Sequence, residues 1–169
     1  NDVEYTRETL ASYPDRVVVQ RLSASEEGAL NFSVRLQTPH AGQRLTAVNS
    51  SGLLLTGRVE DVSLEKLSKT DQELYQRMFG GKGLRFAIQV RVLTESGRVL
   101  AGDGAVTVEG ATTATLLVSI ATSFRDFTRI DGDPVVETNR VFEKLSGKPF
   151  RQILANHTGD YRELFGLMS

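Results

Sequence analysis

Residues 83–127 contain four apolar segments separated by turns, and this arrangement restricts the chain to a mainly β fold. Apolar residues occupy every second position from 86 to 92 and again from 114 to 120. Successive side chains of a strand point to opposite faces, so this spacing gives each segment one apolar face. The gaps between the segments are rich in Gly, Asp and Ser, which favour turns. The region therefore predicts four strands joined as an antiparallel meander.

The residues before position 83 predict further strands and one insertion. The strands are expected at 3–7, 17–22, 30–36, 44–48 and 53–57. The valine run 17–19 is typical of a strand buried on both faces. Residues 60–82 differ, because leucines at loose helical spacing lie among Glu, Lys and Gln. This segment predicts an insertion with one or two short helices, and a long polar loop is the alternative.

The last forty residues predict two helices. Asp133 followed by Pro134 is typical of a helix N-cap, and Gly147 and Pro149 favour its end. A second helix is expected from Pro149, with a break possible at Gly159. Its apolar and aromatic residues share one face: Phe150, Ile153, Leu154, His157, Tyr161, Leu164 and Phe165. Strands followed by helices indicate an antiparallel two-sheet β-sandwich with a helical segment after it, and exclude a βαβ fold.

Charge and composition exclude several classes of function. Twenty Lys and Arg against 21 Asp and Glu give a net charge of -1, which lacks the basic excess of a nucleic-acid-binding protein. No apolar run approaches the roughly 20 residues that span a bilayer. The chain has no Cys, hence no disulfide and no thiolate metal site. We expect no nucleic-acid or membrane partner, no cofactor and no metal.

Few residues are candidates for catalysis. The two histidines, His40 and His157, have no partner at metal-ligand spacing, and packing or hydrogen bonding is the expected role of His157. The glycine-rich stretches 80–83 and 102–104 match no phosphate-binding motif and are expected to be turns. We expect no catalytic residue and no metal ligand, and the sequence identifies no substrate-binding residue.

One stretch combines aromatic and charged residues at the end of the last strand. It comprises residues 123–127 and 131–134, with Phe124, Phe127 and several Arg and Asp. Loops that leave a sandwich often carry binding residues. Two interpretations stay open: an Arg–Asp surface pair beside a helix cap, or a ligand-binding loop.

The chain resembles the N-terminal β-sandwich domain of bacterial α-L-fucosidases of glycoside hydrolase family ninety-five. The resemblance rests on the order and spacing of short motifs: YTRE at 5–8, ASYPD at 11–15, VVV at 17–19, LTGR at 55–58, GLRF at 83–86, VEGA at 108–111, ATLL at 114–117, ATSF at 121–124, DP at 133–134 and DYRELF at 160–165. It implies a super-sandwich at residues 1–130 that lacks its first strands, and helices at 131–169 that lead towards a missing catalytic barrel.

The resemblance also implies a function and a setting. The parent enzyme would hydrolyse terminal fucosyl linkages of fucosylated oligosaccharides with inversion, and would be periplasmic or secreted. The partner of this domain would be the catalytic barrel of the same parent chain, and these 169 residues alone would not be an enzyme. The alternative is a stand-alone carbohydrate-binding or docking β-sandwich module of another multidomain glycoside hydrolase.

Overall fold

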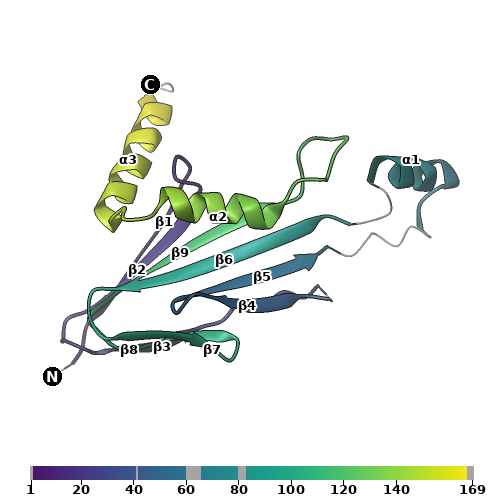
Figure 1. Ribbon diagram of the computed structural model, residues 1–169. Coiled ribbons are helices and arrows are strands. Elements are labelled where there is room, and N and C mark those ends of the chain that lie inside the picture. The colour runs from purple at the N-terminus through teal and green to yellow at the C-terminus, as the bar shows by residue number, and fades with distance from the viewer. Residues whose placement is uncertain (1, 41, 60–65, 80–82, 167–169) are drawn as a thin grey trace.

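Two antiparallel sheets and a layer of helices form the protein (Figure 1). The computed structural model describes residues 2–40, 42–59, 66–79 and 83–166. In spatial order, the large sheet consists of β1 (Tyr5–Ser12), β2 (Val17–Ala24), β9 (Thr113–Thr122), β6 (Arg85–Thr94), β5 (Gly52–Arg58) and β4 (Arg44–Val48). The small sheet consists of β3 (Leu30–Val34), β8 (Ala105–Ala111) and β7 (Arg98–Gly102). The helices are α1 (Lys69–Phe79), α2 (Pro134–Lys144) and α3 (Phe150–Gly166).

The predicted mainly β, two-sheet class is confirmed, but the predicted meander is wrong. β6 pairs with β9 and β5 in the large sheet, whereas β7 pairs with β8 in the small one. The chain changes sheet between β6 and β7, at a turn where Gly97 has φ +76° and lies against the backbone of Glu109 and Gly110. Alternation shows which face of a strand is apolar, but it does not show which strand lies next to it.

The main core lies between the two sheets. Its buried residues come from both layers: Leu30, Leu53, Val90, Val92, Val106, Val108, Ala111 and Ala114. Four of them lie at alternate positions of β6 and β8, as the sequence pattern predicts. The alternation of residues 86–92 therefore identifies the face of β6 that packs on the small sheet.

A second core lies on the opposite face of the large sheet, under the helices. Val17 and Val19 of β2 pack there with Phe142 of α2 and Ile153 of α3. Val18 points to the other face and is 39% exposed. The prediction of a strand buried on both faces is therefore wrong at Val18, because the small sheet does not cover this part of β2.

The helix predictions are confirmed in their main features. The Asp133 carboxylate accepts hydrogen bonds from the backbone N–H of Val135 and Val136, at 3.0 and 3.2 Å, as an N-cap does. The chain leaves α2 through Gly147, which has φ +73°. α3 continues without a break through Gly159. In the insertion, residues 69–79 form the helix α1, and residues 60–65 and 80–82 lie outside the described residues.

One buried carboxylate joins the first hairpin to the terminal helices. Asp15, in the turn between β1 and β2, has a side chain that is 3% exposed. Its oxygens accept hydrogen bonds from Ser12 Oγ at 2.8 Å, from Lys148 Nζ at 2.6 Å and from Asn156 Nδ2 at 3.1 Å. Lys148 and Asn156 lie more than 130 residues away in the chain, so these bonds fix α3 over the hairpin.

The partners of Asp15 also determine its titration. Burial by itself raises the pKa of this carboxyl, but the hydrogen bonds from Lys148, Ser12 and Asn156 outweigh burial. The net pKa lies below the ordinary value of 3.8. Asp15 therefore stabilises the fold above pH 3.8, and this contribution is lost as the pH falls through the lower pKa of the folded state.

We predict that Asp15→Asn lowers the free energy of unfolding by about 2 kcal/mol at pH 7, because it removes the charge that Lys148 faces. Urea titrations of both proteins at several pH values measure the difference. The control is Asp103→Asn, at an exposed turn residue with φ +48°, a conformation that Asn tolerates. The difference between wild type and Asp15→Asn should shrink below about pH 4. A difference that does not change with pH would contradict this role of the carboxylate.

Candidate functional site

The loop 123–133 and the helix α3 project on the same side of the large sheet, on either side of α2 (Figure 1). Both expose large apolar side chains. The exposed fractions are 57% for Phe124 and 79% for Phe127 in the loop, and 37% for Leu154, 51% for Tyr161, 56% for Leu164 and 51% for Phe165 in α3. We call these six side chains the projecting surface.

The loop 123–133 is closed at its base by hydrogen bonds. Gly132 N–H donates to the Ser123 carbonyl at 2.9 Å, and Arg85 donates a guanidinium N–H to the Gly132 carbonyl at 2.7 Å. The backbone N–H of Arg85 donates to Oγ of Ser123, the first residue after β9, at 3.0 Å. Gly132 has little room for a side chain, because a Cβ there would lie 3.0 Å from the Ser123 carbonyl oxygen.

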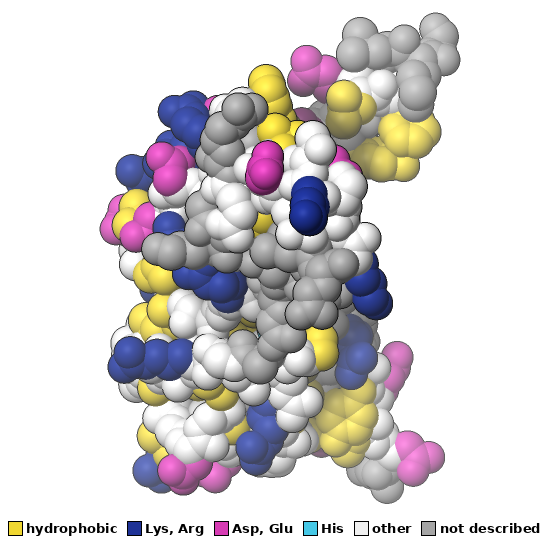
Figure 2. Space-filling view, turned by 90° about the vertical axis from the view of Figure 1, so that its right-hand side faces the viewer, with side chains coloured by type: hydrophobic (Ala, Val, Ile, Leu, Met, Phe, Trp, Pro, Cys, Tyr) yellow, Lys and Arg dark blue, Asp and Glu magenta, His cyan; other side chains and the backbone are white. Residues whose placement is uncertain are grey.

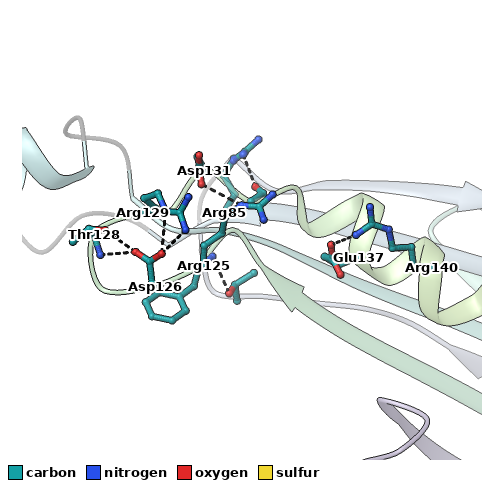
Figure 3. Close-up of polar contacts among 11 residues, drawn as sticks. Arg85, Arg125, Asp126, Thr128, Arg129, Asp131, Glu137 and Arg140 are labelled. Carbon is teal, nitrogen blue, oxygen red and sulfur yellow. Dashed lines mark hydrogen bonds and ion pairs between the residues drawn. The ribbon is translucent and has the colours of Figure 1, made fainter.

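The tip of the loop is held by Asp126 (Figure 3). Its Oδ1 accepts from Thr128 N–H at 3.0 Å and from Thr128 Oγ1 at 2.7 Å, and its Oδ2 accepts two guanidinium N–H groups of Arg129, at 2.9 and 2.7 Å. Across the loop, Nε of Arg125 lies 3.3 Å from Oδ1 of Asp131, so the two side chains form an ion pair. These hydrogen bonds hold the tip in one conformation, and a loop held in this way loses less entropy in an interface than a free one.

These contacts limit the chemistry of the loop. Hydrogen bonds from Arg129 and Thr128 hold the pKa of the Asp126 carboxyl well below its ordinary range. Asp126 is consequently a hydrogen-bond acceptor and has no proton to donate near neutral pH. The predicted Arg–Asp surface pair and the predicted helix cap at Asp133 are both confirmed. The arrangement is suited to presenting Phe124 and Phe127.

The other sequence candidates lie apart from this loop. His40 follows β3 and its ring lies 5.6 Å from that of Phe86, whereas His157 lies on α3 with its ring 6.2 Å from that of Tyr161. Of the stretch 102–104, Asp103 and Gly104 form the turn between β7 and β8, as predicted, whereas Gly102 is the last residue of β7. Of the glycine-rich stretch 80–83, residues 80–82 lie outside the described part. In the described residues, no group of three or more His, Asp or Glu side chains could hold a metal ion.

α3 carries the other half of the projecting surface. Of the apolar face that the sequence predicts, Ile153 is buried against the sheet and His157 is partly buried. The exposed members are Leu154, Tyr161, Leu164 and Phe165. The rings of Tyr161 and Phe165, one helical turn apart, lie 4.4 Å from each other. Figure 2 shows the end of α3 standing clear of the rest of the molecule with hydrophobic side chains along it. Sequence periodicity identified this face but not its exposure, because exposure depends on how far the sheet extends beneath the helix.

None of the described helices is both long and apolar enough to cross a lipid bilayer.

Two comparisons with known proteins both find similarity to glycoside hydrolases. The family model described as the N-terminal domain of glycosyl hydrolase family 65 matches residues 1–127. The alpha-L-fucosidase 2 of Arabidopsis thaliana is 29% identical over 177 residues, and the alignment includes 99% of this chain. The chain spans only 21% of the length of that relative.

We predict that Asp126→Asn increases the motion of residues 124–131, because the substitution weakens four hydrogen bonds at the tip. Backbone order parameters from ¹⁵N relaxation measure the change. The melting temperature should change little, since the affected groups are exposed. The control is Asp131→Asn, which removes one exposed ion pair and should leave the tip ordered. Unchanged order parameters in Asp126→Asn would show that the clamp does not hold the tip.

Proposed function

We propose, on the premise that this chain belongs to the family of N-terminal domains of glycosyl hydrolase family 65, that its parent enzyme is an α-L-fucosidase. The chain itself is the N-terminal domain of a glycoside hydrolase. The observation that carries the fucosidase proposal is the alignment of almost the entire chain with an alpha-L-fucosidase. Membership of glycoside hydrolase family ninety-five and a bacterial source, both expected from the sequence, stay predictions.

In this proposal, the catalytic groups lie outside residues 1–169. The parent enzyme hydrolyses terminal α-L-fucosyl linkages with inversion. It uses two carboxyl-type groups about 6.5–9.5 Å apart, so that a water molecule fits between one of them and the sugar. The low pKa of the Asp126 carboxyl supports a non-catalytic role for the loop, since a general acid needs a raised pKa.

The domain supports a catalytic barrel, and we assign the contact to the projecting surface. Three observations support this. Four of its six side chains are aromatic, and aromatic residues are enriched at protein interfaces. The loop that carries Phe124 and Phe127 is already ordered by Asp126. α3 rises from the large sheet on the side where this surface lies (Figure 1).

A second candidate function is a carbohydrate-binding or docking module of another multidomain glycoside hydrolase. Phe124 and Phe127 favour it, because exposed aromatic rings can stack on the apolar faces of sugars. Titration of residues 1–169 with fucosylated oligosaccharides, followed by NMR shifts of these two residues, separates the candidates. Saturable shifts at both residues support the binding module, and their absence supports the structural role.

We predict that the full-length parent protein releases L-fucose from fucosylated oligosaccharides, and that the β-anomer appears first because the reaction inverts the configuration. NMR of the early product identifies both sugar and anomer. Residues 1–169 alone should release nothing. Release of another sugar by the parent protein, or of fucose by the isolated domain, would contradict the proposal.

We further predict that Phe127→Asp lowers the melting temperature of the full-length protein by several degrees, because it places a charge in a buried contact. The same substitution in residues 1–169 should have little effect, since Phe127 is 79% exposed there. The control is Leu100→Asp, at a 44% exposed position on the small sheet. Equal effects of Phe127→Asp in both proteins would place the contact elsewhere.

A further inference from the structure

A groove of about 810 Å³ lies between the two sheets, on the side away from α2 and α3. Inner-face side chains of the large sheet form one wall, among them Tyr5 and Arg7 of β1, Leu22 of β2 and Leu116 of β9. The opposite wall consists of the consecutive residues 29–35, which include all of β3. The Tyr5 hydroxyl approaches the Ala29 carbonyl oxygen to 3.5 Å and joins the two walls at one end.

The lining by consecutive residues shows which part of β3 faces the groove. Side chains of a strand alternate between its two faces, so no single face of β3 could contribute residues 29–35 without interruption. The feature that successive residues share is the backbone edge of the strand. In the small sheet β3 pairs with β8 on one side only. The groove is therefore bounded by backbone N–H and C=O groups that no strand among the described residues pairs with.

The large sheet extends beyond the small one at this groove. The small sheet has three strands against six, and β7 contacts β4 at its far end, so β3 is the strand nearest to β1 and β2. Beyond β3, inner-face residues of the large sheet lack a cover: Tyr5 is 61% exposed and Val18 is 39% exposed. An open edge beside an uncovered apolar sheet face favours the addition of a strand.

We propose that a β-strand from outside residues 1–169 of the same polypeptide pairs with the free edge of β3 and fills this groove. The added strand extends the small sheet beneath β2 and β1. Its sequence alternates, with apolar residues facing the large sheet and polar residues facing solvent, as in β3 itself. The proposal depends on the proposed function only for the source of the strand, since a multidomain parent supplies further polypeptide.

A segment of the same polypeptide fits the observations better than a separate partner. The chain spans 21% of the length of its fucosidase relative, which leaves most of such a protein to supply the strand. Tethering gives a segment of the same chain an effective concentration in the millimolar range, whereas a separate peptide must bind from dilute solution. The backbone wall of the groove runs along residues 29–35, so an extended segment can pair with β3 over that stretch.

Hydrogen exchange of the β3 amides tests the proposal. In the full-length protein, the amides of residues 30–34 that do not pair with β8 should exchange at least about 100-fold more slowly than in residues 1–169. The amides of β8, which is central in the small sheet, are the internal control and should be protected in both proteins. Equal exchange of the edge amides in the two proteins would overturn the proposal.

A pair of substitutions tests the same surface within the full-length protein alone. Tyr5→Lys should lower its melting temperature by at least about 3 °C more than the control Leu100→Lys, because only Tyr5 is covered by the added strand. Equal shifts would overturn the proposal.

Hydrogen exchange of residues 1–169 alone distinguishes other occupants of the groove. If protection of the edge amides rises with protein concentration, the occupant is a second copy of the chain. If an oligosaccharide induces the protection, the groove is a sugar site. Either result would overturn the assignment to the same polypeptide, and both are independent of whether the parent enzyme releases fucose.

Discussion

The six-stranded sheet has apolar side chains on both faces, and it is stable only between two covering layers. On one face Val90 and Ala114 pack against the small sheet, and on the other Val19 and Leu117 pack against α2 and α3. Burial of these side chains removes apolar surface from water, which is the main favourable contribution to folding. The terminal helices are therefore part of the fold of this domain, although they follow the last strand in the chain.

The two covers differ in how they are attached. The small sheet is held by apolar contacts, by the turns that carry the chain between the sheets, and by single hydrogen bonds such as that from Ala101 N–H to the Ser50 carbonyl, at 2.9 Å. The helical layer is held in addition by the polar cluster of Asp15, Lys148 and Asn156, which fixes α3 over the first hairpin. Such a cluster specifies one position of the helix, whereas apolar contacts alone allow several. The direction in which α3 projects depends on this cluster.

The elements could be predicted from the sequence far better than their arrangement. Alternation and caps identify β6, β9 and α2 because these signals are local. The pairing of β6 with β9 joins residues that are 20 to 36 positions apart, from Thr94 with Ala114 to Phe86 with Thr122. The bonds from Lys148 and Asn156 to Asp15 join residues 133 and 141 positions apart. No local sequence pattern predicts these contacts. The exposure of Val18, Tyr161 and Phe165 was missed for the same reason, because it depends on where the covering layers end.

The two unusual surfaces of the domain have different chemistry. The projecting surface consists of aromatic and leucine side chains on a loop closed by hydrogen bonds and on a helix, which suits a folded partner. The groove beside β3 offers a backbone edge, which suits an extended segment. Both agree with a domain that works as part of a larger glycoside hydrolase. A structure of the full-length protein with a bound fucosylated ligand tests this account most directly. The account predicts that a helical barrel covers Phe127 and Phe165 and that the ligand contacts paired carboxyl groups outside residues 1–169. A ligand held between two carboxylates of this domain would contradict it.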